Sequence, residues 1–211
     1  MLDYFVKQKN YLILIFTVAY LAVFTVNAFI ASNFEFLYYT VLMTVLIYLV
    51  VVMNKRLHLA FFILVNLSLL GFLHLLGGNF YFYETRLYDF FFVPGVIRYD
   101  NIVHTYGTFI ATLALYSLLA DFIDGRIRQR YFIFALILVL MAIGIGTLNE
   151  LGEFLAVLFF GAAEEVGGYF NNALDLFFNT LGSILATIVI YIYRERPRLI
   201  QEINEKIRKN N

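Results

Sequence analysis

Polar and ionisable side chains recur at helical spacing in segments that are otherwise strongly apolar. They form three pairs: Asp100 with His104, Glu150 with Glu153, and Asp175 with Asn179. Residues three or four positions apart lie on one face of a helix, so each pair can present both side chains to the same neighbour. Carboxylate and imidazole groups in this arrangement suit general acid–base chemistry, or the binding of zinc, manganese, iron, magnesium or calcium.

The charge of these pairs needs compensation. Four ionised carboxylates cannot share a partly dry site unless some are protonated or a cation lies among them. The nearby bases are His104, His74 on a separate apolar segment, and Arg86 and Arg98 in the loop between them. Three ways of compensating the negative charge are therefore open: protonation of some of the acids, arginines that extend into the site, or a bound divalent metal.

The elements that position these residues are predicted to be membrane-spanning helices. The chain has 211 residues, of which 62% are hydrophobic and 14% charged, with no cysteine and a formal net charge of zero. A soluble domain is about half apolar and about a quarter charged, so the solvent of this chain must be largely lipid. The absence of cysteine excludes thiolate and disulfide chemistry, and the neutral charge gives no basis for nucleic-acid binding.

Six stretches approach the roughly 20 apolar residues that a spanning helix needs. They run from Tyr11 to Ile30, Phe36 to Met53, Leu59 to Leu76, Ile102 to Leu119, Tyr131 to Phe160 and Asn172 to Tyr193. We therefore predict an all-α integral membrane bundle of six transmembrane helices over residues 1–193. Residues 194–211 are predicted to form a basic cytoplasmic tail, either an amphipathic surface helix or a solvated segment.

Lysine and arginine predict the orientation. If the N-terminus is cytoplasmic, every lysine and arginine except Arg86 and Arg98 falls in a cytoplasmic segment. This asymmetry follows the positive-inside rule and places both termini in the cytoplasm of a multi-pass plasma membrane protein.

The three polar pairs are predicted to meet at one depth. Glu150 lies 19 residues after Tyr131, which is roughly 28 Å along an outward-running helix. His104 and Asp175 lie close to the outer ends of their helices, so the pairs converge near the outer leaflet. Small residues lie within one or two turns of each pair, Gly146 before its pair and the others after theirs, and allow close helix packing: Gly107, Thr108 and Ala111; Gly146; and Gly182, Ser183 and Ala186.

Each polar residue has a predicted role. We expect His104 to act as base or metal ligand, oriented by Asp100, while Glu150, Glu153 and Asp175 bind the metal or share acid and base roles. Asn179 and His74 are expected to bind a ligand or substrate. The competing interpretation is structural, because polar side chains also hold membrane helices together.

The order of these motifs resembles that of a known family. The chain reads H-L-L-G-G, then R-Y-D-N-I-V-H-T-Y-G, then N-E-L-G-E-F, then N-N-A-L-D-L-F-F-N-T-L-G. This order resembles the YjdF-like membrane proteins over roughly residues 59–190 and, more distantly, the VanZ-like proteins. In the VanZ-like proteins the second acid of E-x-x-E is usually glutamine, so Glu153 fits the YjdF-like pattern better. The resemblance implies a shared fold and site but supplies no reaction.

Three functions remain open. The first is a membrane enzyme that acts on a lipid or lipid-linked envelope substrate at the outer leaflet. The second is a small proton- or cation-coupled transporter, although few polar residues are expected in the inner halves of the helices. The third is a non-catalytic scaffold or sensor. No G-x-S-x-G or P-loop motif is present, so the sequence gives no support for serine hydrolase or P-loop chemistry.

Overall fold

The computed structural model describes residues 2–57, 59–120, 122–123, 125–198, 200–201, 205 and 208. Among them, six helices are long and apolar enough to cross a membrane, which confirms the predicted bundle. They are α1 (Leu2–Ile30), α2 (Phe34–Leu57), α3 (Phe61–Asn79), α4 (Tyr99–Leu119), α6 (Tyr131–Phe160) and α8 (Tyr169–Ile190). Half of the predicted tail lies outside the described residues, so its surface helix stays a prediction.

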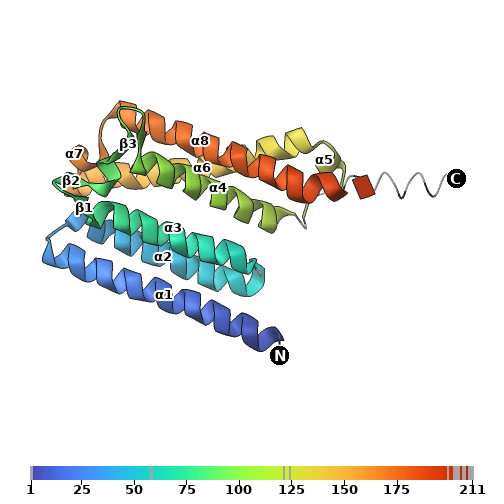
Figure 1. Cartoon of the computed structure of the whole chain (residues 1–211), viewed down its shortest axis with the longest axis horizontal. Helices are drawn as coiled ribbons and strands as arrows, with labels where there is room; N and C mark the ends of the chain where they lie inside the picture. Colours follow the sequence, from blue (N-terminus) through green and yellow to red (C-terminus); the bar gives the residue numbers. More distant parts are fainter. Residues whose placement is uncertain are drawn as a thin grey trace.

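The helices form two groups. In Figure 1, α1, α2 and α3 lie side by side on one side, and α4, α6 and α8 lie together on the other. The start of α1 and the end of α8 lie at one end of the bundle, and the short strands lie at the opposite end. The two groups meet where α3 packs on α4 and α2 packs on α6. This arrangement gives the polar pairs, which are carried by α4, α6 and α8, one shared interior.

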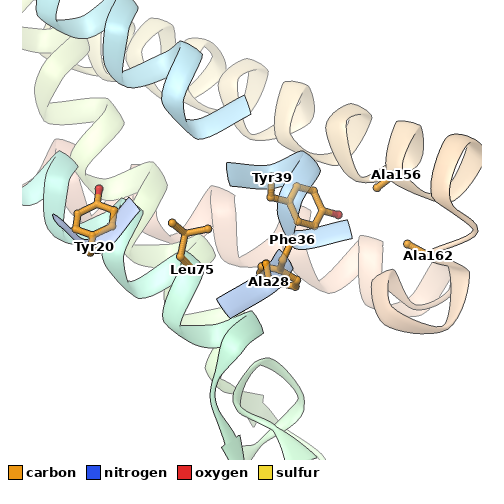
Figure 2. Packing of buried hydrophobic residues seen from close by; sticks show 7 residues of the cluster. All are labelled: Tyr20, Ala28, Phe36, Tyr39, Leu75, Ala156 and Ala162. Atoms are coloured by element: carbon orange, nitrogen blue, oxygen red, sulfur yellow. The ribbon is translucent and has the colours of Figure 1, made fainter. Parts of the chain in front are cut away.

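An apolar cluster joins the two groups. Figure 2 shows Phe36 and Tyr39 of α2 together with Leu75 of α3, Ala28 of α1 and residues of the α6 end, and all belong to one buried cluster. Phe36 is 1% exposed and occupies the space that a side chain on Gly78 would fill. Because Gly78 packs against this ring, α3 continues as a helix to Asn79, beyond the predicted end at Leu76.

The outer connection between α3 and α4 is a compact cap. It contains two antiparallel hairpins, β1 (Tyr81–Phe82) with β2 (Thr85–Arg86) and β3 (Phe91–Val93) with β4 (Ile97–Arg98). A 3-10 turn, η1 (Leu87–Asp89), separates the hairpins. The Tyr88 ring reaches down from η1 against Gly77, and its hydroxyl lies 2.5 Å from Nδ1 of His74. The cap is therefore tied to the outer end of α3.

The connections around α6 are short helices. Helix α5 (Gly125–Gln129) precedes α6, while α7 (Ala163–Val166) links α6 to α8 at the cap end. Helix α8 continues as a π-helix, η2 (Tyr191–Glu195). There the Glu195 side chain, 1% exposed, accepts a 2.7 Å hydrogen bond from the Tyr116 hydroxyl of α4. This pair ties the inner ends of α4 and α8 together.

Candidate functional site

Close contact between α4 and α8 sets the geometry of the site. A Cβ atom on Gly182 would lie 2.1 Å from the carbonyl oxygen of Thr105, so only glycine permits this approach. On the facing side, a Cβ on Gly146 of α6 would lie 2.7 Å from Nδ2 of Asn179. Both predicted glycines thus allow close helix contact, Gly182 with the backbone of α4 and Gly146 with the Asn179 side chain. The polar pairs one or two turns away are brought together.

His104 lies at the centre of the carboxylates. Its Nε2 atom lies 3.2 Å from Oδ1 of Asp100 and 3.8 Å from Oδ1 of Asp175. Its Nδ1 atom lies 3.7 Å from Oε1 of Glu150 and 3.3 Å from Oδ1 of Asn179. Oxygen atoms therefore face both ring nitrogens, while a neutral imidazole has only one N–H to donate. The other ring nitrogen therefore needs a second proton or a metal ion to face its neighbouring oxygen.

Two groups of potential metal ligands share this histidine. The first is Asp100, His104 and Asp175, and the second is His104, Glu150 and Glu153. Within each group one ligand atom per residue lies within 4.8 Å of the others, close enough for one cation to contact all three after small side-chain movements. Oxygen and imidazole donors of this kind suit zinc, manganese, iron, magnesium or calcium.

Asparagine amides hold the outer oxygens of three carboxylates. Asn172 donates to Oε2 of Glu150 at 3.1 Å, Asn171 donates to Oδ2 of Asp175 at 3.0 Å, and Asn149 donates to Oε1 of Glu153 at 2.9 Å. Such supporting hydrogen bonds orient the ligands in metal sites. Sequence reasoning missed these asparagines, although Asn149 and Asn171 each precede an acid of the site by four residues.

The inward oxygens of two acids have no hydrogen-bond donor. Oε1 of Glu150 and Oδ1 of Asp175 are buried without a partner, and the residues are 6% and 0% exposed. Buried polar atoms are nearly always hydrogen-bonded, and a buried carboxylate needs a positive charge nearby. The two oxygens are therefore positioned to accept a cation or a proton between the acids and His104.

A pocket of about 90 Å³ leads from the cap to this cluster. Its walls include Asp100 and Glu153 of the cluster, His74 of α3, and Arg86 and Arg98 of the cap. His74 therefore borders the pocket but belongs to neither metal-ligand group. The role of His74 in binding remains a prediction, because its Nδ1 is already engaged by Tyr88.

The cap arginines lie on the pocket wall and contact other acids. Arg86 donates from Nε to Oδ2 of Asp89 at 2.9 Å and lies 3.7 Å from Glu35. The nearest acid to Arg98 is also Asp89, at 4.0 Å. One of the three predicted ways of compensating the negative charge was that these arginines pair with the four acids of the cluster. In the described ion pairs the arginines contact Asp89 and Glu35 instead.

The inner halves of α4 and α8 are more polar than expected. Thr112, Ser183 and Thr187 are buried there, in addition to the Tyr116–Glu195 pair. The expectation that polar partners would be scarce at this depth is therefore wrong. The three hydroxyls donate to backbone carbonyls of their own helices, which satisfies them without an ion.

Comparison with known proteins agrees with the architecture. A family model described as "Predicted membrane protein (DUF2238)" matches residues 12–196, which span all six long helices. Neither a curated protein nor a solved structure matches the chain.

Proposed function

The chain belongs to the DUF2238 family of predicted membrane proteins, and from this premise we propose that it holds a divalent metal in the outer half of the bundle. The metal would serve chemistry on a lipid or lipid-linked substrate of the outer leaflet. One observation carries the proposal: inward carboxylate oxygens of Glu150 and Asp175 are buried without a donor beside His104.

The ligand set follows from the two faces of the imidazole. His104, Glu150 and Glu153 would bind the ion, and Asp100 would orient the ring through its 3.2 Å contact with Nε2. Asp175 also faces Nε2, at 3.8 Å, so it would be the ligand if the ion bound on that side instead. A histidine ligand usually donates its second N–H to a carboxylate, which raises the basicity of the ligating nitrogen. The arrangement favours a metal on the Nδ1 side, near Glu150 and Glu153. Asn179, whose oxygen lies on that side, would help to hold the ion or the substrate.

Depth supports a lipid-derived substrate. The cluster lies in helices long and apolar enough to span a membrane, within about three turns of their cap-side ends, and the pocket beneath the cap reaches it. The uneven distribution of lysine and arginine supports an outward-facing position for this end. A bound metal would supply Lewis acidity to the substrate or to a water molecule. Glu153 and Asp100, which line the pocket, are the residues placed to orient that substrate or to hold a proton.

Metal content tests the proposal. The full chain is purified in detergent after metal-replete expression and analysed by mass spectrometry beside a Glu150→Gln, Glu153→Gln variant. We expect a near-stoichiometric divalent metal in the wild type and its loss in the variant. Glu84→Gln is the matched control, because Glu84 is exposed in the cap and belongs to neither metal-ligand group.

The alternatives predict different results. Absence of metal from both proteins would leave a shared-proton or structural network and would contradict the proposal. Equal metal in both proteins would place the ion elsewhere. Metal lost from Asp175→Asn but retained in the Glu150→Gln, Glu153→Gln variant would move the ion to the Nε2 side of His104.

A further inference from the structure

Arg98 is a partly buried cation with few close partners. Its side chain is 19% exposed, and its ion-pair partner Asp89 lies at 4.0 Å, too far for a hydrogen bond. Within the described part of the chain no hydrogen bond from its guanidinium group is found, although the group lies 5.8 Å from the centre of the Phe91 ring. A guanidinium group has five N–H donors, so burial in this state leaves most of them for a ligand.

Asp89 does not fully compensate Arg98, because Arg86 competes for it. The Asp89 carboxylate accepts a 2.9 Å hydrogen bond from Nε of Arg86. Arg86 also lies 3.7 Å from Glu35, so two acids pair with Arg86 at closer range than the 4.0 Å between Arg98 and Asp89. Of the two arginines on the wall of the pocket, Arg98 is therefore the less closely paired.

The same pocket reaches the proposed metal ligands. Arg98 lines it together with Asp100 and Glu153. The pocket, with a volume of about 90 Å³, has room for a small polar group such as phosphate. A group held there would have the guanidinium on one side and the metal cluster on the other. Phosphate oxygens are commonly bound by the planar guanidinium group of an arginine together with a metal ion.

An apolar groove borders the β4–α4 junction. It has a volume of about 310 Å³ and is lined by Ile97, Ile102, Phe109 and Phe178, among others. Ile97 precedes Arg98 in the sequence, so the groove begins beside the residue that lines the pocket. Its apolar lining suits a hydrocarbon chain.

We propose that the pocket binds a phosphate-bearing anion, either a phosphomonoester or a diphosphate, between Arg98 and the metal ion. This inference rests on the proposed function and names its substrate class. The ligand can be the head of a lipid, with its chain in the groove, or a free phosphate, and both share the chemistry that Arg98 recognises.

Binding measurements on the metal-loaded full chain test the inference. Inorganic phosphate, pyrophosphate, and nanodiscs containing phosphatidic acid or only phosphatidylcholine are the probes. We expect phosphate-bearing probes to bind the wild type and to bind Arg98→Gln at least about tenfold more weakly, since charge-assisted hydrogen bonds contribute about 1.5–3 kcal/mol. Arg98→Lys should recover only part of the affinity, because lysine lacks the fork. Arg130→Gln, exposed at the opposite end of the bundle, is the control.

The outcomes separate the two proposals. Binding of phosphatidic acid but not of inorganic phosphate identifies a lipid ligand, and equal binding of both identifies a free anion. Unchanged affinity in Arg98→Gln, with unfolding temperature and metal content preserved, overturns the inference. If the wild type retains metal but binds no phosphate-bearing probe, the inference is wrong and the metal centre stands. If the wild type holds no metal and binds no probe, both are wrong.

Discussion

The carbonyl oxygen of Thr105 lies so close to Gly182 that a Cβ atom there would be 2.1 Å away. Asp100 and His104 lie within about a turn and a half of Thr105 on α4, and Asp175 and Asn179 lie within two turns of Gly182 on α8. The backbone contact therefore fixes the depth at which the two polar pairs face each other.

Gly182→Ala is expected to destabilise the protein. The added methyl group must push α8 away from α4, and overpacking of this kind costs about 1–3 kcal/mol. Gly144→Ala is the matched control, because nothing lies within 4 Å of a Cβ at Gly144. Thermal unfolding in detergent should show a lower midpoint for Gly182→Ala alone. Equal midpoints would mean that the two helices can separate at no cost.

Asp100→Asn is expected to weaken metal binding without abolishing it. Asp100 contacts Nε2 of His104 at 3.2 Å, and loss of an orienting carboxylate typically lowers metal affinity about 10–100-fold. Competition with a metal-sensitive dye gives the affinity. Complete loss of metal would instead make Asp100 a ligand, and unchanged affinity would remove it from the site.

Single cysteines test the orientation, because the chain has none of its own. Tyr83 in the cap is 90% exposed and Phe122 at the opposite end is 82% exposed. A membrane-impermeant maleimide added to intact cells should label Tyr83→Cys and not Phe122→Cys. The reverse pattern would place the cap, and with it the pocket, on the cytoplasmic side.

The Tyr116–Glu195 pair should show strong coupling. Tyr116→Phe removes the 2.7 Å hydrogen bond to a carboxylate that is 1% exposed, and an unsatisfied buried group costs about 1–3 kcal/mol or more. The further change Glu195→Leu removes that group as well, so the double variant should be more stable than the sum of the two single effects predicts. Additive changes in unfolding midpoint would show that the pair contributes no coupling.

Tyr88 should make stability fall at high pH. Burial raises the pKa of Tyr88 well above its ordinary value of 10.0. The unfolded chain loses this proton near pH 10 while the folded protein keeps it, so stability is fully present below pH 10 and declines above it, by up to about 1.4 kcal/mol per pH unit. Tyr88→Phe should show a shallower decline between pH 10 and 11. Parallel curves for the two proteins would rule out a contribution from Tyr88.

The amino-acid sequence by itself determined the helices and their polar faces. Hydropathy is a local property, so six apolar stretches predict six spanning helices whatever their partners are. Helical spacing likewise places His104 one turn after Asp100, and Glu153 one turn after Glu150, before any tertiary contact is known. The exact ends of the helices were less certain. Gly77 and Gly78, for example, belong to α3 because Tyr88 and Phe36 pack against them.

Only the tertiary structure decided which atoms meet. The rotation of the helices and the depth at which they cross decide which oxygens of Glu150 and Asp175 point inward. They also decide which asparagines hold the outer oxygens, and they set the position of Arg98 over the pocket. Rotation and depth are set by contacts such as that of Gly182 with Thr105, which join residues far apart in the chain. Local spacing holds no information on those contacts, so it predicted the faces but not their partners.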